Sequence, residues 1–372
     1  MNIGIDIRAL SPVKRSGVGN YVFHAIEHLI SNDQNNQYYL FSSGWRASDY
    51  LPVELSADNI HHVHYKTSNK LFNLRLLLNI APKIDKLFPV KLDLFWLPNI
   101  NFLNLSKNLP MILTVHDLSF LHSKHFYSLK RKWWHTLINV RRLVDRANKI
   151  IAVSDNTKRD IMRFFTVAED KVKVIYPGAS VKQMDKVKAD KLLAKHNLPA
   201  KFYLFLGTLE PRKNIAAIIK AFDKYHQEYP DTYLVLVGNK GWVYQKLLRS
   251  IKKRTYIKYL GFIPSPIKDA LYFSSQGLIW PSFYEGFGFP PLEATFHGRP
   301  VITSYKTSLP EIMRSQALYV DPYNSAEIYQ LLKSLREDKD LLANIKNSSQ
   351  GFFMPVWSKQ VKKIIKLFEE CV

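Results

Sequence analysis

Short apolar runs alternate along the chain with segments in which apolar residues recur at helical spacing. Alternation of this kind is typical of βαβ units, which build parallel sheets. The first half contains runs that we expect to be strands at 2–7, 37–41, 60–64, 93–96, 111–115, 150–153 and 172–175. The second half contains further expected strands at 202–206, 233–237, 257–260, 278–280, 301–303 and 318–320. The pattern therefore predicts an α/β protein with two doubly wound parallel-sheet domains.

A lysine-rich segment at 181–199 separates the two series of strands, and we expect the domains to be joined near residues 180–195. At 372 residues the chain is longer than one hydrophobic core normally supports, which also favours two domains. The last segment, 358–370, sets apolar residues among lysines at helical spacing. It predicts an amphipathic helix at the end of the chain.

Composition points to a folded protein of the cell interior. Hydrophobic residues make up 47% of the chain and aromatic residues 13%, which argues against disorder. Asp6 stands where a signal peptide would need a basic and then an apolar region, and no window approaches about 18 uncharged apolar residues. Cys371 is the only cysteine, so no internal disulfide can form. We expect the protein to begin at Met1 and to be cytoplasmic.

The net charge says more about possible partners than the overall composition does. The chain has 53 Lys and Arg against 31 Asp and Glu, a net charge of +22, which favours polyanionic partners or an anionic membrane surface. Residues 121–175 carry a local excess of basic residues together with Phe126, Tyr127, Trp133 and Trp134. Basic and aromatic side chains in combination suit a membrane interface. A solvated helix face with the tryptophans buried beneath it is the alternative.

The strongest functional signal follows the fourth expected strand of the second half, where an apolar run leads into Pro-Ser-Phe-Tyr-Glu-Gly-Phe-Gly-Phe-Pro-Pro-Leu-Glu at 281–293. Gly286 and Gly288 let backbone amides approach a ligand, and a helix opened by the Pro-Pro pair would favour an anion. We place Glu293 in the first turn of that helix, directed toward the same crevice as Glu285. Two carboxylates beside an anion can accept hydrogen bonds from sugar and ribose hydroxyls. A plain strand–loop–helix junction is the alternative.

A second signal lies at the end of the first strand of that half. Arg212 and Lys213 are followed by Asn214, which can cap the next helix. Two cations at a strand end can hold a diphosphate and neutralise the charge that grows as it leaves. A solvated Arg-Lys turn is the alternative.

Two strand ends of the first half also carry candidate chemistry. Gly17 and Gly19 follow the first strand and precede an expected helix at 21–30, so a loop there can approach a phosphate, although the third glycine of a dinucleotide fingerprint is missing. His116 and Asp117 follow the fifth strand, and a satisfied buried pair is the alternative to a functional role.

Metal and hydrolase chemistry find little support. Three histidines, His61, His62 and His64, fall on one strand, but alternate residues of a strand point to opposite faces and no cysteine joins them. The serine-hydrolase elbow and the P-loop lysine motif are absent from the sequence.

Together these motifs resemble the family-4 retaining glycosyltransferases, in particular the bacterial mannosyltransferase-like members that build surface polysaccharides. Two glutamates separated by seven residues, with Gly-Phe-Gly-Phe between them, are the most specific part of the resemblance. Other matching segments are 17–19, 114–120, 151–154, 176–178, 207–214 and 307–312. The resemblance implies the GT-B fold, with two Rossmann-like domains facing across a deep cleft. The acceptor-binding domain would span 1–185, with the helix at 355–372 packed back on it, and the nucleotide-sugar-binding domain would span 195–350.

The resemblance also implies roles for residues. Glu285 is similar to the glutamate that binds donor-sugar hydroxyls, Glu293 to the ribose ligand, and Arg212 with Lys213 to the pyrophosphate clamp. His116 is similar to the acceptor-domain histidine near the transferred sugar. The other implied donor-binding positions are Gly17, Gly19, Asp117, Gly207, Thr208, Gly261, Phe262, Ile263, Gly286, Phe287, Gly288 and Phe289. Many relatives have arginine where this chain has Thr208, so the clamp would depend on Arg212 and Lys213.

The activity implied is retaining transfer of a hexose, with mannose from GDP-mannose as the first choice, to an oligosaccharide or lipid-linked glycan acceptor in polysaccharide or lipopolysaccharide biosynthesis. No residue is a convincing covalent nucleophile, so we expect front-face displacement that needs no metal and no cofactor besides the donor. A lipid-linked acceptor would bring the protein to the inner face of the cell membrane as a peripheral protein.

Two alternatives from other classes remain. One is a GT-B-related sugar-nucleotide epimerase. The other is a basic nucleic-acid-binding protein, which is disfavoured because no helix-turn-helix, aromatic RNA platform or finger spacing accompanies the charge. We therefore expect no nucleic-acid partner.

Overall fold

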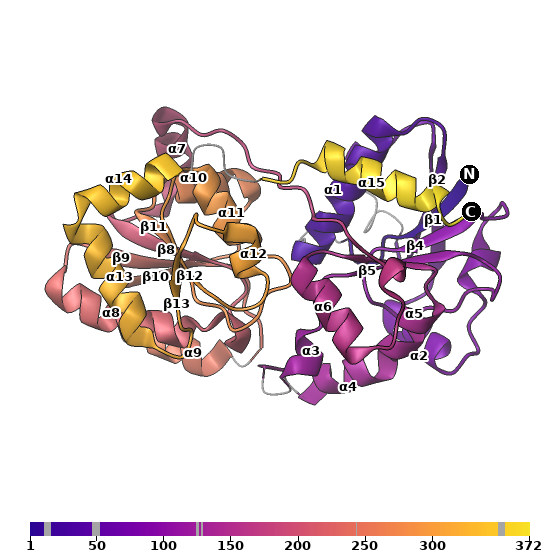
Figure 1. Ribbon diagram of the computed structural model, residues 1–372, viewed down its shortest axis with the longest axis horizontal. Helices are drawn as coiled ribbons and strands as arrows, with labels where there is room; N and C mark the ends of the chain where they lie inside the picture. Colours follow the sequence, from indigo (N-terminus) through magenta and orange to yellow (C-terminus); the bar gives the residue numbers. More distant parts are fainter. Residues whose placement is uncertain (11–15, 47–52, 124–125, 128, 243, 349–353) are drawn as a thin grey trace. The chain divides into compact units, whose positions relative to one another are not determined.

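The chain forms two compact units, each built on one parallel sheet (Figure 1). The computed structural model describes residues 1–10, 16–46, 53–123, 126–127, 129–242, 244–348 and 354–372. The first unit comprises Met1–Leu121, Leu129–Ser180 and Pro355–Val372, and the second comprises His122–Ser128 and Val181–Met354. The chain therefore passes from the first unit to the second near residue 180 and returns near residue 355.

The first unit contains a seven-stranded sheet in the order β3-β2-β1-β4-β5-β6-β7. Its strands are β1 (Asn2–Asp6), β2 (Gln37–Gly44), β3 (Ile60–Lys66), β4 (Leu94–Leu97), β5 (Met111–Val115), β6 (Lys149–Ala152) and β7 (Val172–Val174). Its helices are α1 (Gly17–Asn32), α2 (Asn69–Leu77), α3 (Ser119–His122), α4 (Leu129–Ile138), α5 (Val140–Arg146), α6 (Asp155–Phe164) and α15 (Trp357–Glu369). The strand order reverses direction between β1 and β4, which are paired neighbours.

The second unit contains a six-stranded sheet in the order β10-β9-β8-β11-β12-β13. Its strands are β8 (Phe202–Leu206), β9 (Tyr233–Val237), β10 (Ile257–Gly261), β11 (Gly277–Trp280), β12 (Val301–Ser304) and β13 (Leu318–Val320). Its helices are α7 (Lys186–Leu193), α8 (Ile215–Glu228), α9 (Tyr244–Lys252), α10 (Ser265–Ser274), α11 (Phe289–Phe296), α12 (Leu309–Met313), α13 (Ser325–Glu337) and α14 (Lys339–Ser348). Here the order reverses between β8 and β11.

The edge strands β3, β7, β10 and β13 are mostly half-buried, whereas the inner strands of each sheet are almost wholly buried because helices cover both faces of the sheet. This explains why they read as continuous apolar runs, and each run predicted from the sequence contains a strand. Reversal points matter for function, because the connections on either side of such a point leave the sheet in opposite directions and open a crevice at the carboxyl ends of the strands.

The C-terminal helix α15 packs in the core of the first unit against α1 (Figure 1). Trp357 and Phe368 are both almost fully buried, and burial of side chains this large contributes about 1.5–3 kcal/mol each. Gly178 lies directly beneath α15, where an added Cβ would fall 2.3 Å from the Trp357 ring. A side chain at position 178 would therefore push the helix away from the unit.

One local expectation from the sequence is wrong. Gly17 and Gly19 lie in the first turn of α1 rather than in a loop before it, because the Ser16 hydroxyl caps the helix by accepting from the Gly19 amide at 3.1 Å. The rest of the expected glycine loop, residues 11–15, falls outside the described residues. The lysine-rich segment also contains a helix, α7, which packs on α10.

Part of the segment that links α3 to α4 belongs to the second unit. Phe126 stacks on Phe283 with ring centroids 5.7 Å apart, and Tyr127 stacks on Trp242 at 5.5 Å. Two aromatic residues that the sequence suggested for a membrane interface are therefore engaged in ring contacts within the second unit.

Candidate active site

The reversal point of the second sheet brings together the two strongest sequence signals. Arg212 and Lys213 lie in the 3-10 turn after β8, and Glu285 lies in the loop after β11. The Lys213 Nζ donates to Glu285 Oε1 at 2.5 Å, and the Arg212 guanidinium donates to the Tyr284 carbonyl at 3.2 Å. The Phe283 amide in turn donates to the Arg212 carbonyl at 2.9 Å. Because β8 and β11 are neighbours in the sheet, segments 72 residues apart form one structure.

We call Glu210, Arg212, Lys213 and Glu285 the charged cluster. Their side chains are only 5–13% exposed, and Arg212 also pairs with Glu210 at 2.8 Å. Burial is the main reason that the pKa of Lys213 is lowered; the neighbouring Arg212 acts in the same direction, whereas the charge of Glu285 opposes it. The Lys213 ammonium also lies 4.7 Å from the Trp280 ring centroid.

Buried charges of this kind cost desolvation energy and add little to stability, so a cluster at a sheet's reversal point indicates a functional site. The cluster contains two cations and two carboxylates. The carboxylates pair with the cations, so the cluster is electrically balanced. The sequence missed Glu210, although its position two residues before Arg212 is where a partner for the guanidinium could have been sought.

The loop between Glu285 and α11 is braced from a third segment. The Glu285 amide donates to the Thr307 hydroxyl at 2.9 Å, while the Ser308 hydroxyl lies within 3.0 Å of the carbonyls of Glu285 and Phe287. Gly288 caps α11 with a φ of +108°, a conformation that favours glycine. The proline pair that follows has no N–H groups, so the start of α11 offers an anion fewer donors than an ordinary helix start.

Glu293 does not lie in the first turn of its helix, as the sequence suggested. It is the fifth residue of α11, which begins at Phe289. Its carboxylate pairs with Lys268 and accepts a hydrogen bond from the Tyr272 hydroxyl at 2.9 Å, both from α10. Burial is the main reason that the pKa of Tyr272 lies well above its usual value, so this hydroxyl remains a donor. Neither partner was expected from the sequence.

Asn214 does not cap α8 with its side chain, contrary to expectation. It adopts a left-handed conformation with φ of +56°, and its amide donates to the carbonyls of Pro281 and Pro322. The residue therefore fastens the turn that carries Arg212 and Lys213 to the loops after β11 and β13.

The other implied donor-binding positions follow β8 and β10. The Gly207 amide donates to the Val237 carbonyl, and an added Cβ there would lie 2.6 Å from the Trp280 ring. Thr208 is half-buried, next to this glycine. Gly261 ends β10 with a φ of +73°, and Phe262 beyond it is 45% exposed, with Ile263 partly buried.

In the first unit, His116 lies at the carboxyl end of β5. Its Nε2 is 2.9 Å from the Pro98 carbonyl, which can only accept, so Nε2 carries the proton and Nδ1 of the neutral ring is an acceptor. Burial lowers the pKa of His116, so the ring stays neutral at pH values below the usual histidine pKa. The ring contacts Tyr21 of α1 edge-on at 4.7 Å. The Asp117 carboxylate accepts hydrogen bonds from the Ser119 amide and hydroxyl at the start of α3.

The histidines of β3 lie as strand geometry requires. His62 and His64 both contact the Ser42 hydroxyl at 2.8 Å, while His61 contacts Gln37 on the other face. Within the described ranges, no group of three or more His, Cys, Asp or Glu is placed to hold a metal ion.

Comparison with known families gives this geometry its context. Residues 15–183 match the family described as Glycosyltransferase Family 4, and residues 189–352 match Glycosyl transferases group 1. The chain belongs to the family-4 glycosyltransferases. The two matches divide this glycosyltransferase chain close to the point where the first unit passes into the second.

The fold is GT-B, as the resemblance implied. Sucrose-phosphate synthase from Thermosynechococcus elongatus superposes with a TM-score of 0.75 at 17% identity, over 100% of this chain and 98% of that one. HepE from Anabaena, solved with UDP and glucose, superposes with a TM-score of 0.69 at 17% identity, over 99% of each chain.

A relative by sequence is the O-antigen chain mannosyltransferase B of Escherichia coli. It is 33% identical over 235 residues, which cover 61% of this glycosyltransferase chain and 61% of the relative. The match thus spans about three fifths of the length of that relative.

Proposed function

We propose that the protein transfers a hexose from a nucleotide sugar to a glycan or lipid-linked glycan acceptor, with retention of configuration and without a metal ion. The charged cluster is the observation that carries this proposal. Family membership and the similarity to an O-antigen mannosyltransferase favour mannose from GDP-mannose as the donor and bacterial surface polysaccharide as the product. The neighbour solved with UDP and glucose supports a nucleotide sugar as the ligand class.

The chemistry assigned to the cluster follows from its geometry. Arg212 presents a planar fork and Lys213 a point charge, so together they can hold a diphosphate and stabilise its charge as the glycosidic bond to the donor breaks. Glu285 has a second carboxylate oxygen that can accept from a hydroxyl of the transferred sugar. In front-face displacement the acceptor hydroxyl attacks from the side on which the diphosphate leaves, and the departing phosphate takes the proton.

Glu293 is assigned to the ribose of the donor. Lys268 and Tyr272 occupy part of its hydrogen-bonding capacity, but an ionised carboxylate has about four acceptor positions. The two α10 side chains fix the rotamer of Glu293, so the remaining positions are held in one direction.

Donor identity can be tested by thermal unfolding with GDP-, UDP- and dTDP-sugars. A ligand that binds only the folded state stabilises it by about 2.7 kcal/mol at 100 times its Kd, which for a unit of this size corresponds to a rise in Tm of roughly 5–10 °C. We expect GDP-mannose to give the largest rise. Absence of a rise with any of the nucleotide sugars would overturn the proposed function.

We also propose that the first unit attaches to an anionic membrane through an apolar surface on α2. Leu71 and Leu74 of α2 and Leu78, which follows its last residue, are 42–57% exposed, and Lys70 and Arg75 lie among them. Exposed leucines with basic neighbours suit the boundary between lipid headgroups and acyl chains.

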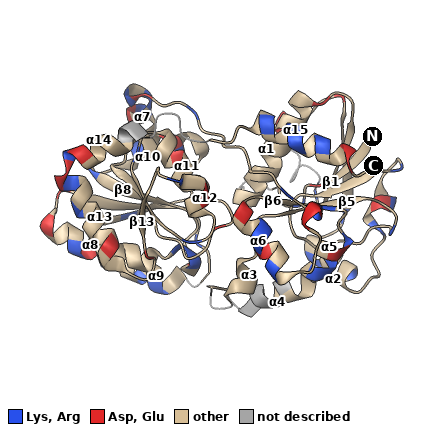
Figure 2. Cartoon of the chain, in the orientation of Figure 1, with Lys and Arg blue, Asp and Glu red and all other residues tan. Residues whose placement is uncertain are grey.

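Helix α4 lies beside α2, because both helices line one pocket. Trp133 on α4 is 68% exposed, which removes the interpretation of a tryptophan buried beneath a solvated face. The basic stretch before Trp133, residues 130–132, was also expected at this surface, but its side chains lie outside the described ones. Arg141 and Arg142 of α5 are exposed, although in Figure 2 Lys and Arg are spread over both units, with Asp and Glu among them. Throughout the ranges that the structure covers, each helix is too short or too polar to cross a bilayer.

Co-sedimentation with anionic vesicles tests this attachment. The triple variant Leu71→Gln, Leu74→Gln, Leu78→Gln should lower the partition coefficient at low salt by about tenfold or more, equivalent to 1.4 kcal/mol of lost apolar transfer. Val187→Gln is the matched control, because Val187 is an 81% exposed apolar residue of the second unit. If wild type and triple variant bound the vesicles equally, α2 would not be part of the membrane-binding surface.

A further inference from the structure

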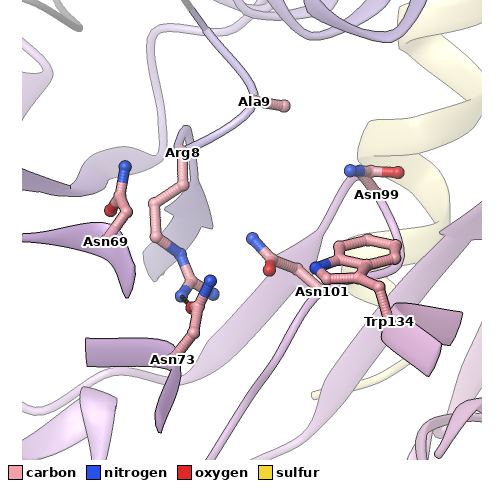
Figure 3. A pocket seen from close by; sticks show the side chains of 7 residues that line it. All are labelled: Arg8, Ala9, Asn69, Asn73, Asn99, Asn101 and Trp134. Atoms are coloured by element: carbon pink, nitrogen blue, oxygen red, sulfur yellow. Dashed lines mark hydrogen bonds between the residues drawn. The ribbon is translucent and has the colours of Figure 1, made fainter. Parts of the chain in front are cut away.

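The reversal point of the first sheet holds a pocket that the proposed donor chemistry does not use (Figure 3). Its volume is about 220 Å³, and we call it the amide pocket. It is lined by Arg8, Ala9, Asn69, Asn73, Asn99, Asn101 and Trp134. Arg8 and Ala9 follow β1, the two asparagines numbered 99 and 101 follow β4, and the others come from α2 and α4. The pocket therefore occupies in the first unit the place that the charged cluster occupies in the second.

The positive charge of Arg8 is neutralised within the protein. Its guanidinium pairs with both carboxylate oxygens of Asp6, and the side chains of both residues are only 3% exposed. It also donates to the Phe102 carbonyl at 2.7 Å and lies 5.6 Å from the Phe72 ring centroid. The wall that Arg8 forms is thus rigid and electrically balanced, so the pocket lacks the unpaired charge that would select an anionic ligand.

Two asparagines present hydrogen-bond donors in a fixed orientation. Asn73 Oδ1 accepts from Arg8 at 3.4 Å, and Asn101 Oδ1 accepts from the Phe102 amide at 2.9 Å. Because these oxygens are acceptors, the amide nitrogens occupy the other position of each side chain and keep N–H groups for a ligand. The Asn99 amide makes no hydrogen bond to another described residue, so it can both donate and accept.

The remaining wall is apolar. Trp134 is 38% exposed, and its ring meets Phe102 edge-on at 6.2 Å. In Figure 3 the side chains of Asn69, Arg8 and Asn73 lie on one side of the pocket, with Asn99, Asn101 and Trp134 across from them. A ligand between them would meet amides on several sides and the indole on one.

We propose that the amide pocket binds one uncharged sugar residue of the acceptor glycan. A pyranose has hydroxyls that match neutral amide donors and acceptors, and a C–H face that packs on an indole. The volume lies below the range of about 300–1,000 Å³ typical of drug-sized ligands, so it suits a single ring rather than a nucleotide. That this sugar belongs to the acceptor rests on the proposed function, but the pocket lies in a different unit from the donor chemistry.

Saturation-transfer NMR with simple glycosides tests binding without catalysis. The probes are the methyl glycosides of mannose, glucose, galactose and N-acetylglucosamine, with methyl glucuronide as an anionic comparator. Wild type should bind at least one neutral probe more tightly than the glucuronide. Trp134→Ala and Asn99→Ala should each weaken that binding by about tenfold, whereas Trp134→Phe should recover part of it.

Trp45→Ala is the matched control, because Trp45 is 68% exposed in the same unit and does not line the pocket. It should bind the probe as wild type does. The inference is overturned if no neutral probe binds, if the glucuronide binds best, or if Trp134→Ala and Asn99→Ala bind like wild type. A nucleotide sugar that still raises the melting temperature in that case leaves the proposed function standing.

Discussion

Replacement of Lys213 by methionine is expected to lower kcat/KM for sugar transfer by about 10²–10³-fold, the usual effect of removing one donor that stabilises charge in a transition state. Nucleoside diphosphate affinity should fall as well, because the ammonium is assigned to the pyrophosphate in both the bound and the reacting state. Transfer assays and titration of the nucleoside diphosphate that best stabilises wild type measure the two effects.

The same substitution should destabilise the protein, since it leaves the buried Glu285 carboxylate without its nearest cation, which lies 2.5 Å away. Removing one partner of a buried pair costs about 3–5 kcal/mol, whereas removing both often costs little. The double variant Lys213→Met, Glu285→Gln should therefore melt at a higher temperature than Lys213→Met and remain as inactive. Lys220→Met, an exposed lysine on α8, is the control. If Lys213→Met transferred sugar at nearly the wild-type rate, Lys213 would not be part of the pyrophosphate clamp.

Replacement of Glu285 by glutamine should reduce kcat by about tenfold, because a hydrogen bond to a carboxylate is stronger by about 1–1.5 kcal/mol than one to a neutral amide oxygen. Affinity for the nucleoside diphosphate alone should fall by less than kcat, since that ligand lacks the sugar which Glu285 is assigned to hold and only the pairing of Glu285 with Lys213 is lost. Comparison of kcat with the Kd of the sugar-free nucleotide separates this result from that of Lys213→Met.

Glu210→Gln is the matched control for Glu285→Gln. Glu210 is similarly buried and pairs with the Arg212 guanidinium at 2.8 Å, from which Glu285 lies 3.9 Å away, but it is not assigned to the sugar. Its substitution should weaken nucleotide binding and transfer together by way of Arg212. If both glutamine variants showed the same pattern, the role of Glu285 would be to position Arg212 and not to bind the sugar.

The sequence identified the loops that carry the site but misplaced details within them. Glu285, Arg212 and Lys213 could be identified from the sequence. Few purely structural roles would account both for two cations at one strand end and for a carboxylate followed by spaced glycines at another. Glu293 was placed in the first turn of α11 but is its fifth residue, because the helix begins at Phe289 under a glycine cap, one residue before the prolines. Helix starts are set by a single backbone conformation, which a sequence pattern locates only approximately.

The amide pocket could not have been found in the same way. Its asparagines are spread over α2 and the segment after β4, and a lone asparagine in a loop ordinarily indicates a turn. Arg8 likewise reads as a solvated residue after a strand, yet its guanidinium is enclosed with Asp6 between aromatic rings.

The sequence by itself determined the number and order of the strands along the chain, because strands buried on both faces must be apolar throughout, and it determined which strand ends carry charge. Only the tertiary structure decided which strands are neighbours. Hydrogen bonding placed β8 beside β11 and β1 beside β4, and that order alone brings Lys213 to Glu285 and Arg8 to the asparagines after β4. Contacts between residues so distant in sequence depend on how the sheets close around their cores, which no local pattern records.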